Sequence, residues 1–106
     1  MIRVEYRRKY HTLTVSGHAG AAPFGEDIVC AGVSALVNAL GVEVQIQDKQ
    51  GCLLHMDVTI TPGHALITAL PWPWARGKTT RAFDMTARGL AMMARDWPKH
   101  VSFLVV

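Results

Sequence analysis

The chain has 106 residues, half of them hydrophobic and 18% charged, which is one domain's length and excludes a disordered composition. A net charge of +3 favours acidic or phosphate-bearing neighbours without identifying them. Two cysteines are too few for a disulfide framework, and the start lacks the apolar core of a signal peptide. We therefore expect one cytoplasmic domain over residues 1–106, and its short apolar runs argue against a membrane span.

Two strands are predicted at the start of the chain. Apolar residues alternate with polar ones in 2–6 and again in 13–15, which is the period of a half-buried strand. These stretches predict a hairpin that ends near 16–18. Two glycines and a proline in 19–25 then predict a loop.

A long amphipathic helix is predicted after this loop. Glu26 or Asp27 is a natural start, because a carboxylate accepts the free N–H groups of a first turn and suits its positive end. The apolar stripe of this helix consists of Val29, Val33, Leu36, Val37, Leu40 and Val44. Gly32 and Gly41 each weaken a helix by about 1 kcal/mol relative to alanine, so we expect close packing to require them.

Two further strands, a second helix and a last strand complete the prediction. Alternation in 54–60 and 64–70 predicts two strands joined by a tight turn, and the two prolines of 71–74 end the second of them. The apolar positions of the second helix are Phe83, Thr86, Leu90, Met93 and Trp97, with Pro98 closing it. A strand in 101–105 follows. The order ββαββαβ predicts an α+β fold with two layers, a mostly antiparallel sheet covered by two helices.

The segment from 16 to 34 gathers residues that can carry chemistry. His18 lies at a strand end, and Cys30 lies in the first turn of the first helix. The unpaired N–H groups and positive end of a helix stabilise a thiolate and can also hold an oxyanion. An imidazole can take the thiol proton and later protonate a leaving amine. From the residues alone, however, a packed cysteine and an ordinary polar histidine are the commoner explanation.

Two motifs of this segment carry a family resemblance. They are Gly17-His18-Ala19 and, after a short loop, Gly25-x-Asp27-Ile28-Val29-Cys30-Ala31-Gly32-Val33-Ser34. Together they resemble the signature of the ribosomal-processing cysteine protease family, Prp, over about a fifth of the chain. The remaining length and order of elements agree with that family.

The resemblance implies a small bacterial cysteine endopeptidase that acts as a homodimer. It implies removal of the N-terminal extension of large-subunit ribosomal protein twenty-seven, by a cut after an apolar and aromatic stretch. The partner is then a ribosomal protein precursor. The resemblance also implies that His18 and Cys30 are the catalytic pair and that the reaction passes through an acyl-enzyme.

Two further residues of the segment have open roles. Asp27 either orients His18 or only caps the helix, and we favour the cap because a negative charge near Cys30 opposes a thiolate. Ser34 lies one turn after Cys30. We expect its hydroxyl to bond the carbonyl four residues back, and a minor catalytic role is the alternative.

The substrate is expected to meet the loop and the aromatic residues. Gly20, Phe24 and Gly25 belong to a candidate substrate loop that can open and close over a peptide. Trp72 and Trp74 either line a pocket for aromatic substrate side chains, lie in a dimer interface or pack on the sheet. The sequence does not decide between these three.

Basic residues support a rival function. Arg81, Arg88 and Arg95 recur every seven residues and lie along one side of the second helix, either as a solvated face or as a weak contact with ribosomal RNA. The rival is a non-catalytic ribosome-associated module that binds RNA or protein. Cys52 and His55 point to opposite faces of a strand and cannot share a zinc ion, so we expect no metal and no cofactor.

Overall fold

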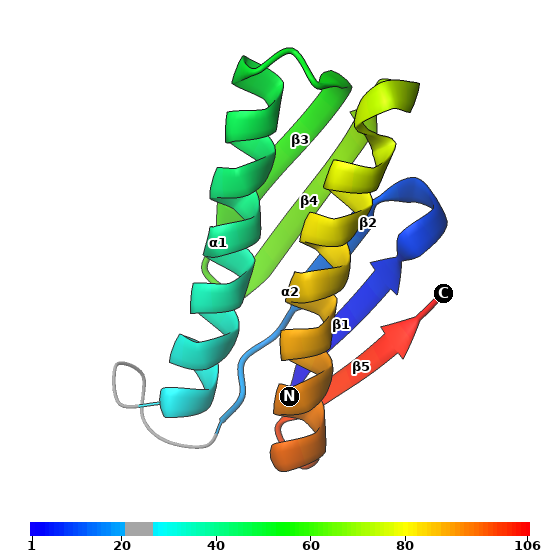
Figure 1. The fold of residues 1–106 in the computed structure, drawn as a ribbon. Coiled ribbons are helices and arrows are strands. Elements are labelled where there is room, and N and C mark those ends of the chain that lie inside the picture. The colour runs from blue at the N-terminus through cyan, green and yellow to red at the C-terminus, as the bar shows by residue number, and fades with distance from the viewer. Residues whose placement is uncertain (21–26) are drawn as a thin grey trace.

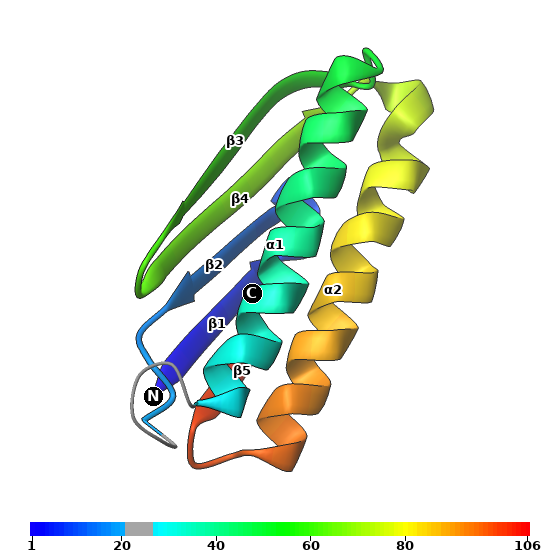
Figure 2. The same ribbon diagram turned by 90° about the vertical axis from the view of Figure 1, so that its left-hand side faces the viewer.

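The computed structural model describes residues 1–20 and 27–106. They form a five-stranded sheet with two helices on one of its faces, as Figures 1 and 2 show. The strands are β1 (Ile2–Arg7), β2 (Thr12–Ser16), β3 (Leu53–Thr61), β4 (His64–Pro71) and β5 (Val101–Val105). The helices are α1 (Ile28–Lys49) and α2 (Arg76–Asp96), with short 3₁₀ turns η1 (Arg8–Tyr10) and η2 (Pro73–Ala75). The predicted α+β class, two layers and ββαββαβ order are confirmed.

The sheet has the strand order β3-β4-β2-β1-β5. Its neighbours are antiparallel except β1 and β5, which pair in parallel from Ile2 opposite Val101 to Tyr6 opposite Val105. The sheet is therefore mostly antiparallel, as predicted. Strand β2 lies near its middle, so the residues that follow β2 emerge between the β3–β4 turn and the start of β1.

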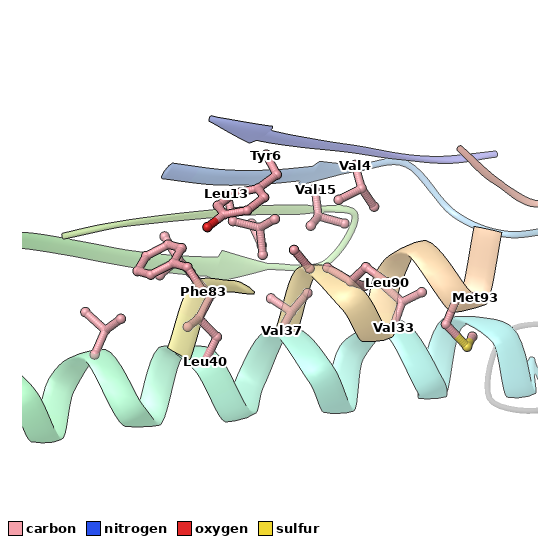
Figure 3. Packing of buried hydrophobic residues seen from close by; sticks show 14 of the residues in the cluster. Val4, Tyr6, Leu13, Val15, Val33, Val37, Leu40, Phe83, Leu90 and Met93 are labelled. Atoms are coloured by element: carbon pink, nitrogen blue, oxygen red, sulfur yellow. The ribbon is translucent and has the colours of Figure 1, made fainter. Parts of the chain in front are cut away.

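The core fills the space between the sheet and both helices, as Figure 3 shows. Alternate residues of β1 and β2 point to the helices and are buried. The side chains labelled there are Val4, Tyr6, Leu13, Val15, Val33, Val37, Leu40, Phe83, Leu90 and Met93, all buried. Full burial of one such apolar side chain contributes about 1.5–3 kcal/mol, so this layer is the main source of stability.

Glycines allow α1 to pack closely on its neighbours. A Cβ atom on Gly41 would lie 3.1 Å from Val58 Cγ1 and 3.3 Å from Ile60 Cδ1, both on β3. A Cβ on Gly32 would lie 2.9 Å from Met93 Cε on α2. Both glycines are therefore closely packed, Gly41 against two branched side chains of β3 and Gly32 against the flexible end of Met93.

Two predicted details differ in the structure. The pairing of β3 with β4 shifts between Leu53 and His55. Leu53 is consequently buried, whereas Leu54, expected on the apolar face, is 51% exposed. Helix α2 ends at Asp96, so Trp97 is its C-cap residue rather than part of its apolar stripe.

Helix α1 is also long and apolar enough to cross a membrane, judged by length and composition alone. This is weak evidence, because core helices pass the same test. Val29, Val33, Val37 and Val44 of α1 are buried in the core. Its outer face is partly apolar as well, since Ile28 and Val42 are exposed.

Candidate active site

A pocket of about 360 Å³ lies between the N-terminal half of α1, the end of β2 and the β3–β4 turn. Cys30 and His18 both line it, so the structure brings the two residues of the signature to one cavity. Most of its other lining is apolar. The apolar side chains are Ile2, Val15, Val33, Val37, Ile60, Pro62 and Ala65, and the polar ones include Ser34, Asn38, Thr61 and His64. The pocket therefore suits an apolar group held beside a thiol.

Asp27 fixes the start of α1 and thereby the position of Cys30. Its carboxylate oxygen Oδ1 accepts hydrogen bonds from the N–H groups of Val29, at 3.0 Å, and Cys30, at 3.1 Å. Its backbone carbonyl accepts from the N–H of Ala31 at 3.0 Å. Asp27 is the N-cap of α1 and is buried, with 8% of its surface exposed.

This cap changes the expected electrostatics at the sulfur. The N–H groups of Val29 and Cys30, which the sequence offered as oxyanion donors, both already donate to Asp27 Oδ1. The amide that faces the sulfur comes from elsewhere. The N–H of Ala19 donates to Cys30 Sγ at 3.3 Å, and hydrogen bonds to sulfur favour its charged form.

The imidazole of His18 lies against Gly63 in the turn that joins β3 to β4. The N–H of Gly17 donates to the carbonyl of Gly63 at 2.9 Å, which joins the end of β2 to this turn. A Cβ atom on Gly63 would lie only 2.8 Å from His18 Nε2. The imidazole is exposed, so it is open to a peptide in the pocket.

Ser34 lines the same pocket as Cys30. Its carbonyl accepts a hydrogen bond from Asn38 Nδ2 at 2.8 Å. Within the described part of the chain its hydroxyl does not form the expected bond to the carbonyl of Cys30. The hydroxyl is exposed and available to a ligand.

The remaining candidates lie apart from these residues or outside the description. Gly20 is exposed and has a φ of +69°. Phe24 and Gly25 lie outside the described residues. Trp72 and Trp74 do not line the pocket, because β4 carries the chain roughly 20 Å away at about 3.3 Å per residue. Both indoles are exposed, at 44% and 71%.

Two histidines near the site had no signal in the sequence. His64 lines the pocket as the first residue of β4. His100, in the α2–β5 connection, places Nδ1 2.9 Å from the carbonyl oxygen of Ala19. Neither belongs to a motif, and tertiary structure alone brings His64 to the pocket and His100 to Ala19.

The described side chains with clearly shifted pKa values lie away from this pocket. The Arg8 guanidinium, bonded to Asp84 at 3.0 Å, lowers the pKa of that carboxyl. Burial and the 2.7 Å bond to Asp84 raise the pKa of Tyr6 above its usual range. Burial, followed by the charge of Arg76, lowers the pKa of His11. These groups join β1 and η1 to α2 and serve the fold.

Comparison with known families gives a match over nearly the whole chain. The family described as cysteine protease Prp matches residues 1–102. A comparison with curated proteins finds no match.

Solved structures share the fold at low sequence identity. The ribosomal processing protease Prp of Staphylococcus aureus, with a covalently linked product peptide, is 19% identical with a TM-score of 0.76 over 100% of both chains. The same protease with a substrate peptide is 15% identical with a TM-score of 0.68, over 99% of this chain and 97% of that one. A protein from Streptococcus mutans is 22% identical with a TM-score of 0.67, over 99% and 91%.

Proposed function

Because this chain belongs to the cysteine protease Prp family and is therefore a cysteine protease, we propose that it cleaves a ribosomal protein precursor with Cys30 and His18. The observation that carries the proposal is that both side chains line one pocket. The amide of Ala19 lies 3.3 Å from Cys30 Sγ and gives the sulfur a hydrogen-bond donor. The similar S. aureus protease holds a covalently linked product peptide.

The proposed reaction proceeds in two halves. His18 takes the proton of the Cys30 thiol, and the sulfur attacks the scissile carbonyl carbon. The carbon–nitrogen bond breaks as His18 returns that proton to the leaving amine. His18 then takes a proton from water, whose oxygen attacks the thioester. The carbon–sulfur bond breaks and His18 returns this proton to the sulfur, which restores the thiol. The carboxylic acid product leaves and loses its proton to water.

We propose the N-terminal extension of large-subunit ribosomal protein twenty-seven as the substrate. The pocket supports a cut after an apolar or aromatic stretch, because Ile2, Val33 and Val37 line it beside Cys30. Burial of an apolar substrate group there releases about 25 cal/mol per Å² of surface removed from water. The similar S. aureus protease is a ribosomal processing protease, which supports the same substrate class.

The setting of the reaction follows from that substrate. Ribosomal protein precursors are made in the cytoplasm, so we propose that this single-domain enzyme acts there, as the homodimer that the family resemblance implies. Arg81, Arg88 and Arg95 are exposed on α2, and we propose a weak contact with ribosomal RNA through them. Arg95 also pairs with Asp96, at 3.1 Å, which leaves less of its charge for a polyanion.

Cleavage of the natural precursor tests the proposal. Purified protein is mixed with the precursor of large-subunit ribosomal protein twenty-seven from the same organism, and products are read by mass spectrometry. We expect one cut after the aromatic stretch. Cys30→Ala and His18→Ala should each lose at least about a thousandfold in kcat.

Two control variants replace a cysteine and a histidine that lie away from the pocket. Cys52→Ala changes a buried cysteine away from the pocket, and His55→Ala changes an exposed histidine on β3. Both should cleave like the wild type. Absence of any cut, together with a Cys30 that alkylates no faster than Cys52, would overturn the protease proposal and favour the RNA- or protein-binding module.

A further inference from the structure

Ala19 is held on both sides by hydrogen bonds to side chains far apart in the sequence. Its N–H donates to Cys30 Sγ at 3.3 Å. Its carbonyl oxygen lies 2.9 Å from His100 Nδ1, across 81 residues of sequence. Ala19 is buried, with 4% of its surface exposed. These contacts link His100 to the sulfur through one backbone residue.

The local sequence around Ala19 does not by itself fix the backbone conformation of this residue. Gly17, two residues before Ala19, has a φ of +94°, and Gly20, directly after it, has a φ of +69°. Glycine allows more backbone conformations than any other residue. The N–H and the carbonyl of Ala19 belong to the two peptide groups that meet at its Cα, so a tertiary contact that holds the carbonyl also restricts the backbone that carries the N–H. In the part of the chain that the structure describes, His100 supplies that contact from a side chain.

His100 is itself held by the fold. Its N–H donates to the carbonyl of Trp97 at 3.0 Å, and its carbonyl accepts from the N–H of Ile2 at 2.8 Å. The backbone of His100 is therefore anchored between the end of α2 and the start of β1. Figures 1 and 2 show the α2–β5 connection at the same end of the molecule as the start of α1.

We propose that His100 is a positioning residue for Cys30, acting through Ala19. Because a carbonyl only accepts, His100 Nδ1 carries the proton and donates. This bond holds the Ala19 backbone in the orientation in which its N–H points to the sulfur. The first-turn N–H groups of Val29 and Cys30 are committed to Asp27, so the Ala19 amide supplies the donor that favours the thiolate. The inference rests on the proposed role of Cys30 as nucleophile.

Two variants of similar size separate donation from packing. In His100→Asn the side-chain amide N–H takes the place of Nδ1–H, whereas His100→Leu has no donor. The rate of Cys30 alkylation by iodoacetamide at pH 7, mapped by mass spectrometry, is the first measurement. We expect a fall of about tenfold for leucine and a rate within about threefold of the wild type for asparagine. kcat on the precursor should follow the same order.

Thermal unfolding of each variant identifies a purely structural role. Equal alkylation rates in the wild type, asparagine and leucine proteins would overturn the inference, even if both variants melt earlier. If the leucine variant does not fold, His100→Ser replaces it, because its shorter side chain does not reach Ala19. Alkylation needs no substrate, so failure of this inference is distinct from failure of the wild type to cleave the precursor.

Discussion

Gly63 meets two requirements at the same position. Its φ of +76° is in the left-handed region, and its missing Cβ leaves room for the imidazole of His18. Gly63→Ala should lower kcat on the precursor by about tenfold to a hundredfold, because small displacements of a catalytic group carry penalties of this size. Steady-state kinetics with the precursor as substrate measure this change in kcat.

Gly51 is a matched control for this substitution. It has a φ of +77°, yet a Cβ there would meet nothing within 4 Å. Gly51→Ala should lose about 1–2 kcal/mol of stability from backbone strain, as Gly63→Ala does, with kcat unchanged. Equal kcat values for the two variants would show that His18 does not depend on the turn.

Two substitutions of Asp27 separate a role as helix cap from a role in catalysis. Asp27→Asn keeps a side-chain acceptor for the N–H groups of Val29 and Cys30, so stability should change little. Asp27→Ala removes that acceptor and should lose about 0.5–2 kcal/mol. Urea unfolding and kcat are measured on both. An unchanged kcat in the asparagine variant supports a cap only, and a large loss there supports an orienting role.

For single residues, the sequence was informative where the functional side chains lie close together along the chain. Cys30 and His18 lie 12 positions apart, and a strand end and a helix start hold them. His100 gave no signal, because it reaches Ala19 across 81 residues. Trp72 and Trp74 were candidate pocket residues, but the length of β4 removes them from it. Composition carries no information about such distances.

The elements followed from hydrophobic periodicity. Alternation predicted the strands, and spacings of three and four predicted the helices, because burial on one face sets both patterns. The shift in pairing at Leu53 was not predictable, since it arises between β3 and β4 rather than within either strand. The parallel pairing of β1 with β5 was not predictable for the same reason.

Alanine substitution of two glycines tests the close contact between α1 and β3. A Cβ on Gly41 would lie 3.1 Å from Val58 Cγ1, whereas one on Gly77, in α2, would meet nothing within 4 Å. Gly77→Ala should gain up to about 1 kcal/mol from helix propensity. Gly41→Ala should lose about 1–3 kcal/mol from overpacking. Urea unfolding compares them, and equal gains would contradict tight packing at Gly41.

The stability of the whole molecule should depend on His11. This histidine is buried, with 5% of its surface exposed, and its Nε2 lies 2.6 Å from Thr80 Oγ1 on α2. Burial and then the charges of Arg76 and Arg8 lower its pKa from 6.5, against an opposing effect of Asp84. Below pH 6.5 the unfolded chain therefore binds a proton that the folded chain does not. Its contribution makes the free energy of unfolding fall as the pH drops below 6.5.

His11→Asn should flatten this dependence. Asparagine tolerates the positive φ of 45° at this position and does not titrate. Urea unfolding between pH 5 and pH 7.5 gives the slope for each protein. His55→Asn, at an exposed position on β3, should keep the wild-type slope. An unchanged slope in His11→Asn would place the titrating group elsewhere.

The pairing of β1 with β5 has a consequence for synthesis. Cys30 and His18 leave the ribosome early, but β5 is made after all the other described elements. The connection that carries His100 docks only when β5 joins β1, beginning with Ile2 beside Val101. Contacts between distant segments form late because loop closure opposes them. We expect a nascent chain that stops before residue 100 to contain the thiol and the imidazole and yet remain a poor protease.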